Sequence, residues 1–299
     1  MELNSLIKRT KGLTAFQIKV IALVVMTMDH IAAFGFEIPI VSRYSGYLRM
    51  IGRLAAPLFL FLLVQSIHHT RSKQKFLLRL YIAGLCVGLF ITAMNVCLGE
   101  VFTYFTPGNI IFTFFYTALY VVLIEQVVSA WAARSWRTLM LSICLIAVSF
   151  VPTILSLQDV LYRFIMPSNA SARIIFLVTG LYDSLLPSFM SIQYGIGLVL
   201  LGVLMYFAKS KNRQCFVFAT FCVICIVGTF VAPTGLDMIQ SFGFFQTFFD
   251  RFQCYMIFAL PIMFLYNGEA GRKCKWFFYV YYPLHRELIF IIAHLIAPG

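Results

Sequence analysis

The feature that most constrains this chain is a series of long apolar runs from one end to the other. Nine runs approach or exceed the ~20 residues that a helix needs to cross a bilayer; they cover residues 18–36, 48–68, 77–98, 109–130, 138–157, 190–207, 215–232, 248–266 and 276–296. Of the 299 residues, 61% are hydrophobic and 11% charged, whereas soluble domains have about 25% charged residues. The sequence therefore predicts an all-α polytopic membrane protein with about nine transmembrane helices, forming one domain over residues 1–299.

Basic residues between the runs predict the orientation. With the N-terminus in the cytoplasm, the inner segments hold fifteen lysines and arginines and the outer loops hold three, Arg43, Arg163 and Arg173. Cytoplasmic loops are enriched in Lys and Arg, so we expect a cytoplasmic N-terminus. The net charge of +12 is then explained by topology, and no nucleic-acid partner is expected.

Residues 158–189 are the segment where the span count is least defined. Their apolar part contains Gly180 and Asp183 and is followed by Pro187, which predicts interfacial or re-entrant structure at the outer face. A tenth helix is the alternative. It would reverse every later loop and place two basic clusters outside, against the charge bias.

Ionisable side chains within the runs are the candidate functional groups, because each costs at least ~2.5 kcal/mol in a bilayer and usually faces a cavity or a partner. They are Asp29 and His30 in the first run, Arg49 and Arg53 in the second, and His285, Arg286 and Glu287 in the last. At about 1.5 Å per residue, His30 lies roughly 18 Å and His285 roughly 14 Å from the inner ends of their helices. Both imidazoles are therefore expected near the midplane, with Arg53 roughly 22 Å from the inner end.

These groups have two interpretations. If their helices are neighbours, the histidines and arginines form one polar pocket. Alternatively they are structural contacts between helices, such as an Asp29–Arg53 pair and a bond from His285 to a backbone carbonyl. We expect Arg286 and Glu287 to be structural and to pair with neighbouring helices, because they lie on other faces of the last helix. So many ionisable groups at one depth favour a functional pocket.

The densest basic segment joins the second and third runs and contains His69, Arg71, Lys73, Lys75 and Arg79. Basic residues at an inner loop can simply anchor the topology. Arginine forks, lysine charges and neighbouring hydroxyls are also the groups that bind phosphate. The segment is therefore either a topological anchor or a phosphate-binding site.

Several motifs, taken in order, resemble the TraX family. They are Lys19, Asp29-His30, Arg53-Leu54-Ala55-Ala56-Pro57, His69-Thr70-Arg71-Ser72 and Tyr281-Tyr282-Pro283-Leu284-His285. The resemblance is strong over about residues 15–85 and 272–290 and diffuse between them. The family is named for the enzyme that acetylates the N-terminus of F-type conjugative pilin. It is similar in turn to transmembrane acyltransferases, including the acyltransferase 3 family and the lysosomal heparan glucosaminide acetyltransferases.

The resemblance implies an acetyltransferase embedded in the bacterial cytoplasmic membrane. An acceptor amine or hydroxyl would be presented from the outer side, on a peptide such as a pilin N-terminus, a glycan or a lipid-linked molecule. The expected catalytic residues are His30 as base or acyl relay, Asp29 to orient or charge it, Arg53 to stabilise charge and His285 as a second acid or base, with Arg49 and Tyr282 binding substrate. The phosphates of cytoplasmic acetyl-CoA would be held by His69, Arg71, Lys73, Lys75 and Arg79.

Two other function classes fit the same residues. Ionisable groups at the midplane also mark ion and substrate paths, so a proton-coupled secondary transporter is the main alternative. The sequence shows no internal repeat, which argues against it. A structural or signalling membrane protein is the third class. No metal is expected, because the eight cysteines show no metal-binding spacing.

Overall fold

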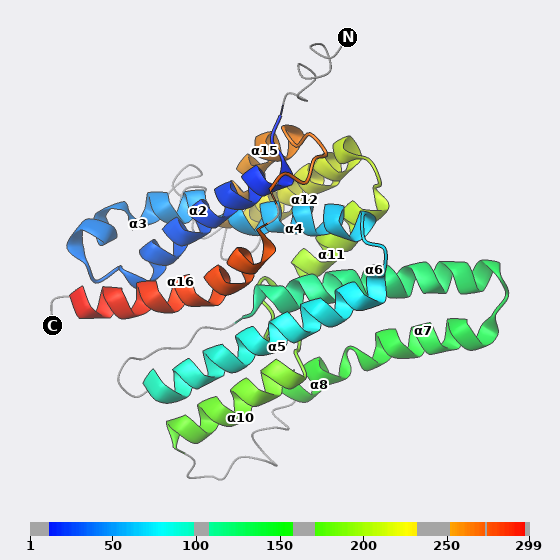
Figure 1. Ribbon diagram of the computed structural model, residues 1–299, viewed down its shortest axis with the longest axis horizontal. Helices are drawn as coiled ribbons and strands as arrows, with labels where there is room; N and C mark the ends of the chain where they lie inside the picture. The colour runs from blue at the N-terminus through cyan, green and yellow to red at the C-terminus, as the bar shows by residue number, and fades with distance from the viewer. Residues whose placement is uncertain (1–11, 99–107, 158–170, 232–251, 273, 297–299) are drawn as a thin grey trace. The chain divides into compact units, whose positions relative to one another are not determined.

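A computed structural model describes residues 12–98, 108–157, 171–231, 252–272 and 274–296 (Figure 1). The regular elements in these ranges are all helices, and the one β contact is an isolated bridge between Leu13 and Tyr266. The helices gather into two compact units, residues 1–65 with 207–299 and residues 66–206. We describe each unit by itself, and the single domain expected from the sequence remains a prediction.

The first unit is built around three helices that carry the ionisable groups. Its elements are α2 (Ala15–Phe34), α3 (Pro39–Gly52), most of α4 (Ala55–His68), α12 (Lys211–Val231), the 3₁₀ helix η1 (Phe252–Ala259), α15 (Leu260–Phe264) and α16 (Lys275–Ile296). Both α3 and α16 pack against α2. A capping box at Thr14 and Gln17 begins α2, where the threonine side chain accepts the backbone N–H of Gln17.

The second unit has an aromatic core. It contains α5 (Lys73–Leu98), α6 (Ile110–Ala132), α7 (Trp136–Val148), α8 (Val151–Leu157), α10 (Ala172–Leu185) and nearly all of α11 (Gly195–Phe207). Its core cluster consists of Phe112, Tyr116, Phe189, Ile192 and Val199. The Tyr116 hydroxyl donates to the carbonyl of Pro187, 2.5 Å away, so the segment after α10 is held against α6.

Two glycines let α5 and α10 approach closely. A Cβ atom added at Gly88 would collide with the Ser184 side chain, and one added at Gly180 would collide with Thr92. Small residues at such contacts allow helices to pack without a hydrophobic driving force between them, as membrane helices must. Gly180, which interrupts an apolar run in the sequence, is thus a packing residue.

Among the described residues, six helices are long and apolar enough to span a membrane: Ala15–Phe34, Pro39–His68, Lys73–Cys97, Ile110–Ala132, Trp136–Ser156 and Lys211–Val231. Two shorter apolar helices, Gly195–Phe207 and Gln253–Phe264, and the 22-residue α16 lie in the other three predicted runs. The all-helical membrane class is therefore supported. The count of nine spans and the cytoplasmic N-terminus remain predictions.

The region of uncertain span count is only partly described. Residues 158–170 lie outside the described ranges, and residues 172–185 form the 14-residue helix α10. This helix is not among the six long apolar candidates, so interfacial or re-entrant placement remains our expectation.

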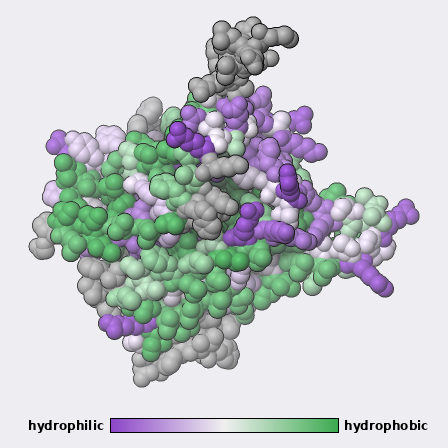
Figure 2. All heavy atoms as spheres, viewed as in Figure 1, coloured by the Kyte–Doolittle hydropathy of each residue, from purple (hydrophilic) through white to green (hydrophobic). Residues whose placement is uncertain are grey.

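Apolar side chains cover much of the molecular surface. Figure 2 shows them as broad green areas, with hydrophilic residues in separate groups. On α7, six large apolar residues are exposed, namely Trp136, Met140, Leu141, Ile143, Leu145 and Val148. An exposed apolar face of this extent is what lipid contact requires and water does not favour.

Candidate active site

Two histidines from opposite ends of the chain meet in the first unit. His30 lies on α2 and His285 on α16, and the Nδ1 atom of His30 is 2.8 Å from the Nε2 atom of His285. The His285 residue is only 5% exposed. The two imidazoles expected at similar depths are therefore in direct contact.

The hydrogen-bond partners define which nitrogen of each neutral ring carries hydrogen. Nδ1 of His285 lies 2.7 Å from the backbone carbonyl of Tyr281. A carbonyl only accepts, so this nitrogen carries hydrogen and Nε2 of a neutral His285 has the lone pair. That Nε2 then accepts from Nδ1 of His30, which leaves the lone pair of His30 on its own Nε2. The two hydrogen bonds, from His285 to the Tyr281 carbonyl and from His30 to His285, thus make Nε2 of His30 the basic atom.

Tyr281 holds the His285 ring in a second way. Its ring stacks on His285 with centroids 4.8 Å apart and planes 9° from parallel. Its hydroxyl lies 2.9 Å from the Thr27 hydroxyl, which donates its own hydrogen to the carbonyl of Leu23. Tyr281 therefore donates to Thr27. This bond joins α16 to α2 about one helical turn before the two histidines in each helix.

Asp29 pairs with arginine and not with its sequence neighbour. Its Oδ1 atom is 2.5 Å from the guanidinium of Arg53, which is 8% exposed, and 3.8 Å from Nε of Arg49. The Asp29–Arg53 pair that the sequence allowed is present. The residue that orients His30 is His285, whereas the expected role of Asp29 on His30 has no contact to support it among the described residues.

The ion pair lies at a close approach of α2 and α3. Gly52 is buried, and a Cβ atom added there would collide with the Asp29 side chain. One carboxylate faces two guanidiniums at this point, so the cluster keeps a net positive charge. Arg49 is the more accessible of the two arginines, with its side chain 33% exposed. It is the group best placed to bind an anion or a polarised carbonyl oxygen.

Arg286 and Glu287 are both buried and contact one another. The guanidinium NH2 atom of Arg286 is 3.0 Å from Oε1 of Glu287. They are adjacent residues of α16 and form this ion pair with one another, whereas the expected pairing with neighbouring helices remains a prediction. A structural role for them agrees with this geometry.

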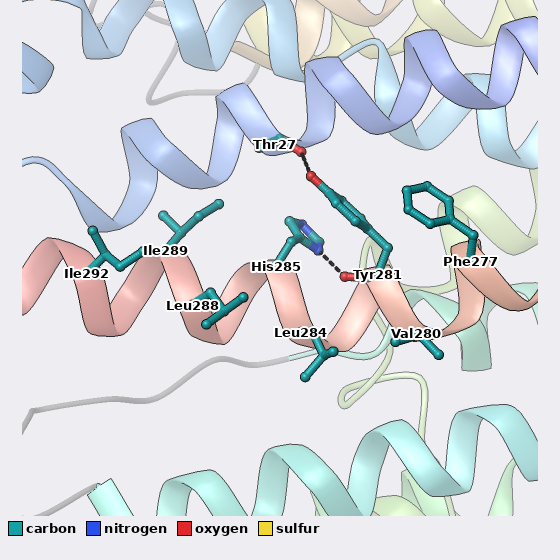
Figure 3. Close-up of a pocket in the computed structure, with 9 residues that line it drawn as sticks. All are labelled: Thr27, Phe277, Val280, Tyr281, Leu284, His285, Leu288, Ile289 and Ile292. Atoms are coloured by element: carbon teal, nitrogen blue, oxygen red, sulfur yellow. Dashed lines mark hydrogen bonds between the residues drawn. The ribbon is translucent and has the colours of Figure 1, made fainter.

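An open groove of about 560 Å³ runs along α16 and is lined in part by His285. Figure 3 shows Tyr281 and His285 directed toward α2, where the Thr27 hydroxyl meets Tyr281. The groove is lined by Thr27, Phe277, Val280, Tyr281, Leu284, His285, Leu288, Ile289 and Ile292. Tyr282, expected to bind substrate, is not among these residues, although its ring centroid lies 6.3 Å from that of His285.

The basic segment lies in the second unit, and one of its residues is engaged by an acid. Nζ of Lys73 is 2.5 Å from Oε2 of Glu125 and 2.8 Å from the Tyr206 hydroxyl. That hydroxyl also lies 2.6 Å from Oε1 of Glu125, and the Tyr206 ring stacks on His68. Lys73 is thus bound to a carboxylate from α6 and is less available to phosphate than the sequence alone indicated.

The other basic residues of this segment are solvent-accessible. Arg71 lies in the turn between α4 and α5 and is exposed, as are His69, Lys75 and Arg79. Arg79 donates from Nε to the carbonyl of Lys75, one helical turn earlier. These four residues keep the accessibility that a phosphate site needs.

Sequence reasoning missed four residues of these sites: Thr27, Tyr281, Glu125 and Tyr206. Tyr281 is four residues before His285, so a shared helix face was readable from the spacing. Glu125 is an acid near the C-terminal end of an apolar run, which pointed to a basic partner. Thr27 and Tyr206 gave no comparable signal, because single hydroxyls are common in apolar helices.

No group of three or more His, Cys, Asp or Glu side chains is arranged to hold a metal ion within the described ranges.

A family comparison adds to this geometry. The TraX protein family matches residues 15–293. The chain belongs to the TraX family. The match includes α2, α3 and the part of α16 that carries His285, so all of the contacts of the histidine pair and of the Asp29–Arg53 pair fall within it.

A curated relative of this TraX-family chain is the probable fimbrial assembly protein FimC, serogroup H1, of Dichelobacter nodosus. It is 36% identical over 109 residues, which make up 35% of this chain and 44% of the relative. The similarity thus spans less than half the length of that relative. No solved structure matches the chain.

Proposed function

We propose that this TraX-family chain is an acetyltransferase of the bacterial cytoplasmic membrane. It transfers an acetyl group from cytoplasmic acetyl-CoA to an amine or hydroxyl presented from the outer side, on a peptide such as a pilin N-terminus, a glycan or a lipid-linked molecule. The observation that carries the proposal is the hydrogen-bonded chain from the Tyr281 carbonyl through His285 to His30. It leaves a lone pair on His30 Nε2, as a general base requires.

The reaction uses that lone pair twice. His30 Nε2 takes the proton of the acceptor as the acceptor's nitrogen or oxygen attacks the acetyl carbonyl. His285 stabilises the resulting imidazolium by accepting the hydrogen on His30 Nδ1. When the tetrahedral intermediate collapses, the C–S bond breaks and His30 returns the proton to the departing thiolate. The base is then regenerated for the next turnover.

The oxyanion of the intermediate needs a positive partner. The cluster of Asp29, Arg49 and Arg53 has one more positive than negative charge, and its carboxylate belongs to the residue next to His30 on α2. Arg49 takes the oxyanion role in our proposal because its side chain is the more exposed. Arg53 positions the carboxylate and, through it, Arg49.

The basic segment of the second unit binds the coenzyme in this proposal. Arg71, Lys75, Arg79 and His69 are exposed and supply donors for phosphate oxygens. Lys73, bound to Glu125 and Tyr206, fixes the start of α5 and contributes less to the phosphates.

The experiment is acetyl transfer by the purified protein in lipid nanodiscs, followed through release of free coenzyme A. His30→Ala should lower the rate about 10²- to 10⁴-fold, the usual worth of a general base, while acetyl-CoA binding persists. The matched control is His294→Ala, which removes a histidine of α16 whose ring contacts Phe290. Near-native transfer by His30→Ala would remove this histidine from the mechanism.

The same assay separates the proposal from the main alternative. A proton-coupled secondary transporter would take up protons with its substrate and leave acetyl-CoA intact. Coenzyme A release that depends on His30 excludes a purely transporting role. Proton uptake without any coenzyme A release would favour the transporter.

A further inference from the structure

Among the described residues that line the groove along α16, three have polar side chains, and each of these already has a hydrogen-bond partner. The Thr27 and Tyr281 hydroxyls bond to one another, and the two ring nitrogens of His285 bond to Tyr281 and His30. The other six lining residues are Phe277, Val280, Leu284, Leu288, Ile289 and Ile292. An occupant of this groove would therefore find an apolar surface without a donor to spare.

This property excludes polar chains as the occupant. The pantetheine arm of coenzyme A and an extended peptide both have amide groups. A buried amide without a hydrogen-bond partner costs about 1–3 kcal/mol. Neither would be stable along this groove over several residues.

The lining also disfavours a transmembrane helix. Helices pack closely in membranes where glycine, alanine or serine lets the backbones approach. Here Thr27 and Val280 are the smallest lining residues, and most of the others are aromatic or large aliphatic side chains. Large side chains instead leave furrows that a flexible hydrocarbon chain can follow.

The dimensions fit one hydrocarbon chain. From Phe277 to Ile292 the groove follows fifteen residue steps of α16, roughly 22 Å of helix. Half of a bilayer's hydrocarbon core is ~15 Å thick. The volume of about 560 Å³ is within the ~300–1,000 Å³ of small-molecule sites.

We propose that this groove binds the hydrocarbon chain of a lipid-linked acceptor and holds its amine or hydroxyl at the His30–His285 pair. The inference rests on the proposed function and narrows its acceptor to molecules with a long alkyl or isoprenoid chain. His285 lies at mid-groove, so a chain that lies in either half places its polar end beside His285, the hydrogen-bond partner of His30. Bilayer lipid is as apolar as the groove, so the hydrophobic effect does not favour the groove over the bilayer. Selective binding of the chain therefore comes from close van der Waals packing against the lining side chains.

The test compares long and short acceptors in a groove-filling variant. The probes are butyl and dodecyl glucoside as hydroxyl acceptors and butyl and dodecylamine as amine acceptors, with acetyl-CoA, in nanodiscs. Leu288→Trp fills the groove at a side chain that is 54% exposed. The matched control is Leu295→Trp, on the same helix, 77% exposed and outside the groove. Both positions are exposed, so the fold tolerates the larger ring.

The measured quantity is the ratio of kcat/KM for the long acceptor to that for the short one. We expect Leu288→Trp to lower this ratio about tenfold, equivalent to about 1.4 kcal/mol, because the long acceptor loses more of its packing than the short one. Leu295→Trp should keep the wild-type ratio, which removes the contribution of membrane partitioning. An equal ratio in all three proteins overturns the inference, while His30-dependent transfer to the short acceptor still supports the proposed function.

A second measurement decides the matter even without turnover. A phospholipid with a diazirine in its acyl chain should label α16 between Phe277 and Ile292 more than the exposed face of α7, and Leu288→Trp should reduce that labelling. Labelling no greater than on α7 overturns the proposal. A third acceptor is a transmembrane peptide with a free amine. If Leu288→Trp slows acetyl transfer to this peptide but not to either dodecyl acceptor, the occupant is a helix and the lipid assignment is wrong.

Discussion

The Nδ1 atom of His30 lies 2.8 Å from Nε2 of His285, which is 255 positions later in the sequence. Because Nδ1 of His285 donates to a carbonyl, this contact fixes the tautomer of both neutral rings. The basic nitrogen of the pair is therefore Nε2 of His30, and His285 is its orienting partner. The two histidines are expected to differ in how they tolerate substitution.

Replacing His285 should separate orientation from proton transfer. In His285→Gln the amide oxygen can still accept from Nδ1 of His30, whereas in His285→Leu nothing can. We expect kcat to fall about tenfold in the glutamine variant and about 10²-fold or more in the leucine variant, with KM for acetyl-CoA unchanged in both. Steady-state kinetics of acetyl transfer give kcat for the wild type and for both variants. Equal losses in the two variants would mean that His285 acts by transferring protons itself.

The contact between α2 and α3 gives a stability prediction with a control on the same helix. Gly52→Ala places a methyl group against Asp29 and should destabilise the protein by about 1–3 kcal/mol, as overpacking does. It should also lower acetyl transfer by displacing the Asp29–Arg53 pair. The measurements are the thermal midpoint in detergent and the transfer rate.

The control is Gly46→Ala, also within α3. A Cβ atom at Gly46 meets no atom within 4 Å, so this change should be neutral or should stabilise by about 0.5–1 kcal/mol through helix propensity. Similar melting of the two variants would mean that the close approach at Gly52 has no energetic role.

The sequence predicted the helices of this protein well because lipid imposes a simple length and composition rule. Each of the nine apolar runs contains a described helix. Gly180 marks a limit of this rule, since glycine that interrupts a run and glycine that permits close packing look alike in sequence. Only the contact with Thr92 distinguishes the two cases.

The candidate site was predictable by residue type and only partly by arrangement. Burial cost singled out His30, His285, Asp29 and Arg53 as groups that need partners. Helical periodicity tells which side chains share a face, but not which helix lies opposite. The bond between the two histidines depends on α16 packing against α2, a long-range contact that the sequence does not encode in any local pattern.

Asp183 gives a prediction on pH. Burial raises the pKa of this α10 carboxyl from its ordinary value of 3.8 to about 6, and a hydrogen bond with Ser191 partly offsets that increase. The folded state then holds the proton more tightly than the unfolded state, so the free energy of unfolding should fall as pH rises from about 4 to about 6. Asp183→Asn should remove this slope and raise the thermal midpoint at pH 7.

The control for that experiment is Glu37→Gln, which removes an exposed carboxylate and the same unit of charge. Thermal midpoints between pH 4 and pH 7 compare the three proteins. A slope that survives in Asp183→Asn would assign the pH dependence to other groups.

The last prediction concerns the coenzyme and the two cations nearest the start of α5. Lys73 is bound to Glu125 and Tyr206, whereas Arg71 is exposed in the preceding turn. We therefore expect Arg71→Ala to weaken acetyl-CoA binding about tenfold, as loss of a charged hydrogen bond of ~1.5 kcal/mol implies. The affinity for acetyl-CoA should also depend less on salt concentration in this variant. Lys73→Ala should weaken binding less than about threefold.

Lys73→Ala should instead act on the fold, because it leaves Glu125 without its lysine partner. Its thermal midpoint should be lower than that of Arg71→Ala, and Glu125→Gln should recover part of the loss by removing the unpaired charge. Calorimetric titration with acetyl-CoA and thermal melting measure the two effects separately. The control is Lys209→Ala, which removes an exposed cation from another turn. If Lys209→Ala weakens binding as much as Arg71→Ala, the basic segment attracts the coenzyme only through its overall charge.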